Sequence, residues 1–204
     1  VKSQSFENVS LVNKKMESYQ FNESNAYLSD DGNTLFFNSS DNTNNTSGLS
    51  DMNDIWYRNK NNGVWGKPIN LREVNTIEND VILGLYKNDL IILRNGSIDY
   101  YDINNQYKLK RTEKIDGFTP NYNLISGSIN YTQDKLFLSF EGFGTYGVED
   151  IYTSEKKNNV WGRLTNIGSS VNSEYQDISP FLHKEDTLVF LSLIHISEPT
   201  RHER

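Results

Sequence analysis

The stretch Asp54-Ile-Trp-Tyr57, followed by Val64-Trp-Gly-Lys-Pro-Ile-Asn-Leu71, decides the fold because the chain carries it twice. The second copy reads Asp150-Ile-Tyr152 and then Val160-Trp-Gly162. Asp54 and Trp65 are 11 residues apart, and so are Asp150 and Trp161 in the second copy. Spacing that is kept this closely indicates an internal repeat, and the period of a repeat decides the architecture.

The repeat continues beyond these signatures. Trp65 and Glu78 are 13 residues apart, as are Trp161 and Glu174. Apolar runs recur along the chain with steps of 55, 46 and 52 residues, taken at Leu35, Leu90, Leu136 and Leu188. The chain therefore holds about three and a half copies of one unit.

Turn residues divide each unit into short strands. Asp31-Gly32-Asn33 joins two apolar runs, and Asn61-Asn62-Gly63 and Lys157-Asn158-Asn159 each separate the Asp-Ile strand from the tryptophan. Glycine tolerates positive φ, and Asp and Asn side chains bond their own backbone, so these stretches predict hairpins. No helical period of useful length competes with this pattern.

A four-stranded unit that repeats every 40 to 50 residues or so, with an aromatic signature, is typical of a β-propeller blade. The sequence thus predicts an all-β fold, a partial β-propeller of about three and a half four-stranded blades over residues 1–190. The expected blades are approximately residues 20–76, 77–122, 123–173 and a truncated 174–190. An unfinished ring exposes strand edges, so we expect poor solubility or self-association.

Composition narrows the classes of partner. The formal net charge is −7 and the pI is about 5.0, which argues against nucleic acid as a partner. There is no cysteine, which excludes a thiolate nucleophile and a zinc–thiolate site. Apolar residues are 35% of the chain but aromatics reach 12%, a share that argues against wholesale disorder. No apolar run approaches the roughly 20 residues of a membrane-spanning helix, so direct membrane insertion is not expected.

The two ends of the chain differ from the repeat between them. Residues 191–201, Leu-Ser-Leu-Ile-His-Ile-Ser-Glu-Pro-Thr-Arg, resemble the translation of a transposase-type sequencing-library adapter over eleven consecutive positions. We therefore expect 191–204 to be an adapter-derived tail that is not native. The chain starts at Val1 without an initiator Met, and residues 1–19 fit the last strand of an earlier blade only loosely.

Taken together, the motifs resemble the WD-like β-propeller repeats of bacterial envelope proteins. The resemblance covers most of residues 20–190. In the first copy it rests on Ser29-Asp-Asp-Gly-Asn-Thr-Leu-Phe-Phe37, on the segments that contain Asp54 and Trp65, and on Val74-Asn-Thr76. In the second copy it rests on the corresponding segments 148–154 and 159–163. Such blades occur in TolB-like proteins and beside OmpA-type peptidoglycan-binding domains. The resemblance implies a periplasmic or outer-membrane-associated, non-catalytic module without a cofactor, whose partner is a protein or a glycan or peptidoglycan-associated molecule.

A residue that recurs in every blade serves the blade more readily than a unique active site. We therefore expect structural roles for the recurring residues Asp31, Gly32, Asp54, Trp65, Asp150, Trp161 and Glu174. The tryptophans are expected to pack between neighbouring blades. The aspartates are expected to accept backbone hydrogen bonds that fix strand ends.

An enzymatic alternative is a propeller-type, sialidase-like glycosidase, or a propeller that gates a hydrolase domain. Glycoside hydrolysis needs two carboxylates across one bond, and Glu78 with Asp80, or Glu174 with Asp177, offers such pairs. Their recurrence argues for a structural role instead. His183 is the one histidine before residue 191, which leaves a hydrolase triad with a single possible member.

Two loops offer sites that the repeat does not explain. The polar loop from Asp41 to Asn53 is rich in oxygen donors that suit Ca²⁺, but its spacing does not match an EF-hand and it also reads as a surface insertion. The glycine-rich loop 141–148 carries Phe143 and Tyr146, which are candidates for partner contact because aromatics on loops anchor interfaces.

Overall fold

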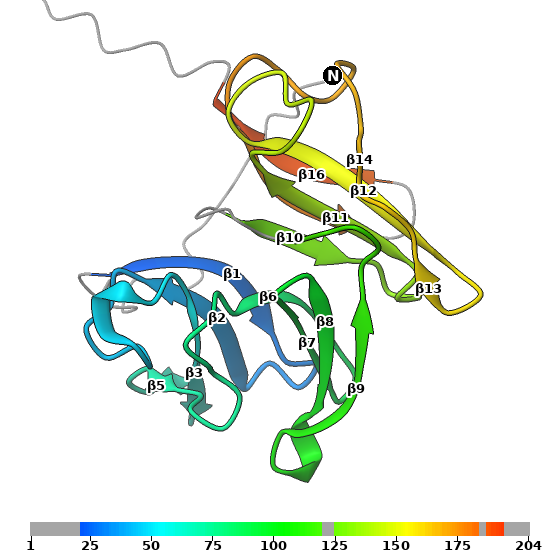
Figure 1. Ribbon diagram of the computed structural model, residues 1–204. Coiled ribbons are helices and arrows are strands. Elements are labelled where there is room, and N and C mark those ends of the chain that lie inside the picture. The colour runs from blue at the N-terminus through cyan, green and yellow to red at the C-terminus, as the bar shows by residue number, and fades with distance from the viewer. Residues whose placement is uncertain (1–20, 120–124, 184–186, 194–204) are drawn as a thin grey trace, which may run out of the picture. The chain divides into compact units, whose positions relative to one another are not determined.

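The computed structural model describes residues 21–119, 125–183 and 187–193 (Figure 1). Within these ranges the regular structure consists of β-strands and two short 3-10 turns, η1 (Gly48–Ser50) and η2 (Ile103–Asn105). The all-β prediction is therefore confirmed. None of the described segments forms a helix long and apolar enough to cross a membrane.

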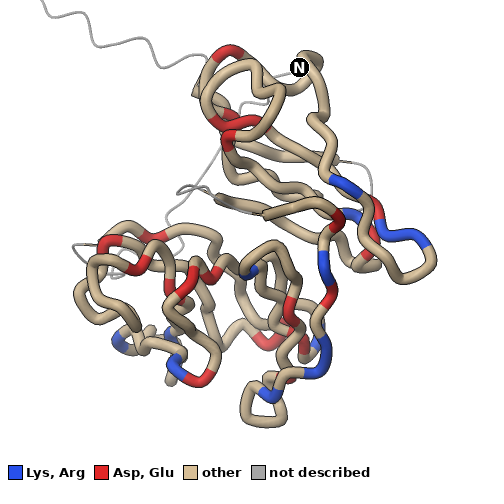
Figure 2. Tube along the Cα trace, in the orientation of Figure 1, with Lys and Arg blue, Asp and Glu red and all other residues tan. Residues whose placement is uncertain are grey.

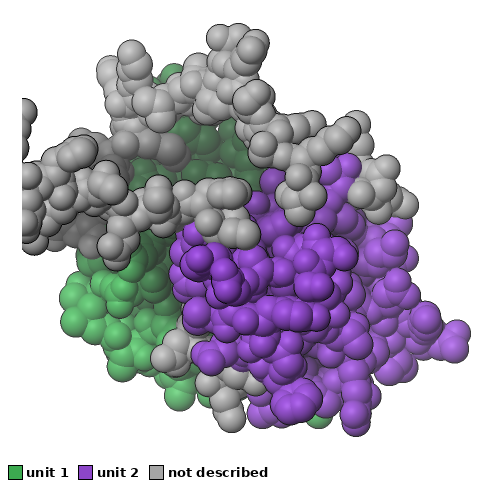
Figure 3. Space-filling view, turned by 90° about the horizontal axis from the view of Figure 1, so that it is seen from above, with its two compact units in different colours: residues 1–114 green, residues 115–204 purple. Residues whose placement is uncertain are grey.

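The chain divides into two compact units, residues 1–114 and 115–204, which are coloured separately in Figure 3. Contacts are concentrated within each of these halves. Each unit is described by itself below.

The first sheet of unit 1 follows the order β1-β2-β3-β4, with β5 also paired to β3. All pairs are antiparallel. Its strands are β1 (Asn22–Leu28), β2 (Thr34–Ser40), β3 (Asp54–Asn61), β4 (Val64–Trp65) and β5 (Ile69–Asn70). The predicted hairpin turn between β3 and β4 is confirmed, since Asn62 and Gly63 both have positive φ, 50° and 79°, as a type I′ turn requires.

The two short strands β4 and β5 are one interrupted fourth strand. β4 pairs with the far end of β3 and β5 with its middle, where Trp56 faces Asn70. Gly66 turns its N–H to the carbonyl of Asn59 at 2.8 Å, and Pro68 has no N–H to give to the ladder. The pairing breaks there, so the sheet has five short strands where the sequence predicted four.

The second sheet of unit 1 runs in the order β6-β7-β8-β9. Its strands are β6 (Val81–Tyr86), β7 (Asp89–Arg94), β8 (Ser97–Asp102) and β9 (Lys108–Lys114). The edge strand β9, Lys-Leu-Lys-Arg-Thr-Glu-Lys, carries the basic residues visible along it in Figure 2. Charged residues on an edge strand discourage pairing with other chains.

One apolar core joins the two sheets of unit 1. Side chains that alternate along β2, β3, β6 and β7 point to it, as a half-buried strand requires. The buried members are Phe36, Ile55, Leu71, Val74, Ile82, Leu90, Ile92 and Tyr101. Burying each such side chain contributes about 1.5–3 kcal/mol, so this cluster stabilises the packing of the two sheets.

Unit 2 repeats the plan of the first sheet, in the order β10-β11-β12-β13 with β14 paired to β12. Its strands are β10 (Ser126–Ile129), β11 (Lys135–Phe140), β12 (Asp150–Lys157), β13 (Val160–Trp161) and β14 (Thr165–Asn166), followed by the two-stranded β15 (Asp177–His183) and β16 (Thr187–Ser192). The register is also the same, since Tyr152 faces Asn166 as Trp56 faces Asn70. Phe137, Ile151 and Leu182 form its core.

The four sheets span residues 22–70, 81–114, 126–166 and 177–192. β16 includes Leu191 and Ser192, the first two residues of the adapter-like stretch, which pair with Ile178 and Asp177. Residues 194–204, like the N-terminal 1–20, lie outside the described part of the chain.

Candidate functional site

The recurring aspartates fix strand ends in both units. Asp54 is fully buried, and its Oδ2 accepts hydrogen bonds from the backbone N–H of Thr46 at 2.8 Å, from the Thr46 hydroxyl at 3.0 Å and from the Asn70 amide at 2.6 Å. Asp150 is also buried and accepts from the equivalent Asn166 at 2.7 Å. Both carboxylates thus accept hydrogen bonds at the first residue of the central strand of their sheet.

An asparagine of the repeat, for which the sequence predicted no role, completes this arrangement. The Asn75 Oδ1 accepts the N–H of Ile55 at 2.8 Å, while its Nδ2 donates to the Ile55 carbonyl and to Asn70 Oδ1 at 2.8 and 2.9 Å. Asn172 does the same for Ile151, at 2.9 Å for the N–H and 3.0 Å for the carbonyl. A side-chain amide therefore takes the place of a backbone partner for the second residue of the central strand.

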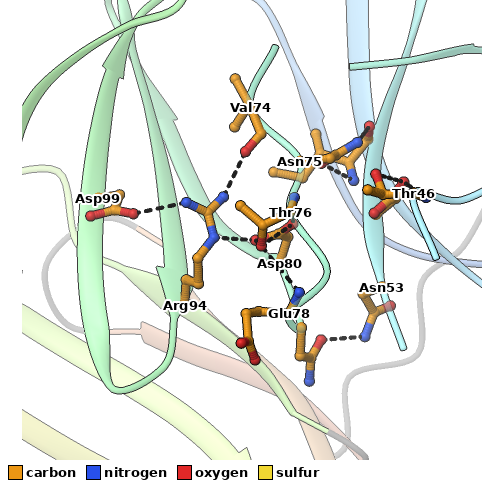
Figure 4. A network of polar contacts seen from close by, with 12 residues as sticks. Thr46, Asn53, Val74, Asn75, Thr76, Glu78, Asp80, Arg94 and Asp99 are labelled. Carbon is orange, nitrogen blue, oxygen red and sulfur yellow. Dashed lines mark hydrogen bonds and ion pairs between the residues drawn. The ribbon is translucent and has the colours of Figure 1, made fainter. Parts of the chain in front are cut away.

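A buried ion pair lies next to this network in unit 1 (Figure 4). Asp80 is fully buried; it accepts from the backbone N–H of Thr76 at 2.7 Å and is ion-paired with the guanidinium of Arg94. Arg94 also donates to the Val74 carbonyl at 2.7 Å and to Asp99 at 3.1 Å. Burial raises the pKa of Asp80, although Arg94 and the Thr76 N–H favour its charged form. The Asp80 carboxylate is occupied by this hydrogen bond and ion pair, and it is not exposed at the surface beside Glu78.

Unit 2 lacks the arginine of this arrangement. Asp177 accepts from the N–H and hydroxyl of Ser173 at 2.6 and 2.9 Å, but its Oδ1 has no partner among the described residues. Its cross-strand neighbour is Ser192, at the register position that Arg94 occupies relative to Asp80. A buried carboxylate oxygen therefore lacks the cation that its counterpart in unit 1 has.

The hydrogen bonds align Glu78 with Tyr175, not with Glu174. The backbone N–H of Glu78 donates to Thr76 Oγ1 at 3.1 Å, and that of Tyr175 donates to Ser173 Oγ at 3.2 Å. The second copy is one residue longer between its tryptophan and this turn. The equal spacing of 13 residues from tryptophan to glutamate therefore does not mark equivalent positions. Glu174 is exposed and corresponds to Ile77 of the first copy.

The two repeat tryptophans differ in burial. Trp161 is fully buried in unit 2, where it forms a β-bridge with Ile115 and has the Lys156 ammonium 4.9 Å from its ring centre. Trp65 is half-buried, with the Lys60 ammonium 5.4 Å from its ring. Each indole ring thus contacts a lysine of the strand with which its own strand pairs. Packing of the tryptophans between neighbouring blades stays a prediction.

Asp31 and Gly32 form the turn between β1 and β2. Asp31 Oδ1 accepts from the Ser29 hydroxyl at 2.6 Å and from the N–H of Asn33 at 3.0 Å. These hydrogen bonds, with Ser29 first, lower the pKa of Asp31. Gly32 has φ +70°, which a glycine adopts without strain.

The polar loop Asp41–Asn53 folds inward. Asn42, Asn45 and Asp51 are buried, whereas Leu49 and Met52, at 66% and 43%, are exposed at the surface as the sequence suggested. Asn45 Oδ1 accepts the indole N–H of Trp56 at 2.9 Å, and its Nδ2 donates to the Ser39 carbonyl at 2.9 Å. The loop is therefore part of the packed sheet.

Two carboxylates meet at the end of this loop. Asp51 Oδ1 and Asp54 Oδ1 are buried without a partner among the described residues. Burial first, and then the charges of Asp54 and Asp80, raise the pKa of Asp51 to about 7. In unit 2 the N–H of Gly147 donates to Asp150 Oδ1 at 3.4 Å instead. In the part of the chain that the structure describes, no cluster of three or more His, Cys, Asp or Glu is placed to hold a metal.

The loop between β11 and β12 displays aromatic side chains. Phe143 is fully exposed and Tyr146 is 55% exposed. The loop is nevertheless fixed, because the Tyr146 N–H donates to Asp150 at 2.9 Å and the Tyr152 hydroxyl donates to the Phe143 carbonyl at 3.2 Å. Exposed Tyr175 lies next to it, with its carbonyl against Gly147. We call Phe143, Tyr146 and Tyr175 the aromatic rim.

A pocket of about 200 Å³ lies in unit 1 beside Trp56. Its lining is Phe21, Glu23, Phe37, Ser39, Asn42, Asn44, Trp56, Lys67 and Pro68. The sequence gave no sign of it, because its residues are far apart along the chain and meet only through the pairing of β1, β2 and β3.

Comparison with known proteins gives no further assignment. A scan against protein-family models finds no match, and a search of curated proteins finds none either.

Proposed function

We propose that this chain is part of a β-propeller that acts as a non-catalytic binding module in the bacterial cell envelope. The two units share one sheet plan, one register and one polar network, which supports the propeller. The carboxylates of Asp54 and Asp150 accept hydrogen bonds that hold strands together, which supports a structural role for them. The envelope location is supported by the resemblance of the repeats to envelope propellers.

The aromatic rim is the observation that carries the binding role. Exposed aromatics on a fixed loop bury large apolar area on association and lose little conformational freedom, which is why they dominate binding energy at interfaces. Phe143 has no packing role that explains an aromatic residue there, since its side chain is fully exposed. The partner is a protein, or a glycan or peptidoglycan-associated molecule, of the envelope.

Co-sedimentation with isolated bacterial envelope material, including purified peptidoglycan, tests this proposal. The Phe143→Ala/Tyr146→Ala double variant is expected to bind at least tenfold more weakly, since the rim anchors the contact. The matched control is Val160→Ala, because this residue is 65% exposed in the same unit but lies in another hairpin. Unchanged binding by the double variant would refute the rim, and turnover of a glycoside or peptide by the protein would refute the non-catalytic role.

A further inference from the structure

The pocket in unit 1 combines apolar walls with polar groups. Phe37 and Trp56 face each other across β2 and β3 and form its wall, so their rings lie on the same side of the sheet. The Trp56 indole is fixed, because its N–H is held by Asn45 at 2.9 Å. A fixed aromatic wall suits a ligand with a flat apolar face.

Hydrogen-bonding groups surround this wall. Asn42 Nδ2 donates to Ser39 Oγ at 3.1 Å, and Asn42 Oδ1 accepts the backbone N–H of Asn44 at 2.9 Å, so these groups are held in position. The side-chain amide of Asn44 and the ammonium of Lys67 are exposed, and neither forms a hydrogen bond or ion pair with the described residues. They are free to bond a ligand.

Charge at the pocket is largely compensated. The one carboxylate of the lining, Glu23, is paired with Arg58 at 3.4 Å. Amides, which both donate and accept, outnumber the remaining charges. This set fits a ligand rich in hydroxyl groups better than a strongly charged one.

Unit 2 explains why the pocket exists. Ser39 lies opposite Asp54, and Phe140 lies opposite Asp150, so the two residues occupy the same position of the repeat. The Phe140 ring stacks on Tyr152 at 4.4 Å and contacts Phe118 at 5.2 Å. An aromatic ring therefore fills the space that the small Ser39 leaves open in unit 1.

From this geometry we propose that the pocket binds one pyranose residue of a glycan. A pyranose ring has C–H groups that contact the parts of Trp56 and Phe37 that line the pocket, residues that are 8% and 5% exposed, and a rim of hydroxyl groups that bonds the exposed Asn44 and Lys67. The assignment rests on the binding function proposed above and names the class of molecule bound, at a site separate from the aromatic rim.

Isothermal titration calorimetry with glucose, galactose and N-acetylglucosamine, together with tryptophan fluorescence, tests the assignment. At least one of these sugars is expected to bind saturably to the wild-type chain. Ser39→Phe, which copies Phe140, is expected to weaken this binding at least tenfold. Asn44→Ala, at an exposed position that the fold does not need, is expected to weaken it several-fold, while the exposed-lysine control Lys108→Ala leaves it unchanged.

The outcomes separate the pocket from the rim. Absence of saturable binding for all three sugars, or full binding by both Ser39→Phe and Asn44→Ala, overturns the pocket assignment. Circular dichroism establishes whether Ser39→Phe is folded, and Asn44→Ala decides the matter if it is not. Envelope binding that persists while sugar binding fails leaves the proposed function standing without the pocket, because Phe143→Ala/Tyr146→Ala tests that function alone.

Discussion

Replacing Asn172 by alanine tests the view that a repeated side-chain network holds each sheet together. Asn172 is 3% exposed and makes three hydrogen bonds, two to the backbone of Ile151 and one to Asn166. The variant orphans the buried N–H of Ile151, which costs about 1–3 kcal/mol. The Ile151 carbonyl keeps a partner in the N–H of Ile167, so that contact, like the one to Asn166, costs only about 0.5–1.5 kcal/mol.

The sum for Asn172→Ala is a loss of about 2–6 kcal/mol in the free energy of unfolding. Urea unfolding followed by circular dichroism measures it. Asn104→Ala is the matched control, because that side chain is exposed and only its backbone N–H is bonded, and its effect is expected within about 0.5 kcal/mol. A loss below about 1 kcal/mol for Asn172→Ala would refute the reasoning.

Two further predictions concern Asp51 and Asp177, each of which has one carboxylate oxygen without a partner among the described residues. The pKa of Asp51 is raised to about 7 in the folded chain. Between pH 4 and 7, roughly, the folded state therefore binds more protons at Asp51 than the unfolded state does. The free energy of unfolding accordingly falls as the pH rises through this range. Asp51→Asn should remove that part of the slope in thermal melts between pH 4 and 8, and an identical slope in both proteins would contradict the cause given. Ser192→Arg should place a cation beside Asp177 and raise the free energy of unfolding by about 1.5–3 kcal/mol, measured by urea unfolding. The same substitution in an Asp177→Asn background is the control. An equal gain there would show that the ion pair does not form.

Local chemistry explains what the sequence could predict. The turn at Asn62 and Gly63 requires positive φ at two successive positions, and few residue types adopt it, so the hairpin was visible in the chain itself. The role of Asp54 followed from its recurrence at a strand end. The exposure of Phe143 was expected from its place in a glycine-rich loop.

The features that the sequence did not reveal depend on cross-strand neighbours. Arg94 becomes the partner of Asp80 only through the register of β6 and β7. Glu174 matched Glu78 in spacing, but an extra residue in the second copy shifts the hydrogen bonds by one position. The pocket depends on the size of Ser39, which has meaning only when compared with its structural equivalent in the other unit.

The central claim, that the recurring residues build two equivalent sheets, is tested most directly by native-state amide hydrogen exchange resolved at single residues. The amides of Ile55 and Ile151, which are bonded to Asn75 and Asn172, are expected to be among the most protected of their sheets. Asn75→Ala should release protection at Ile55 and leave Ile151 protected. Exchange of either amide in the wild-type chain at the rate of an exposed loop would contradict the account.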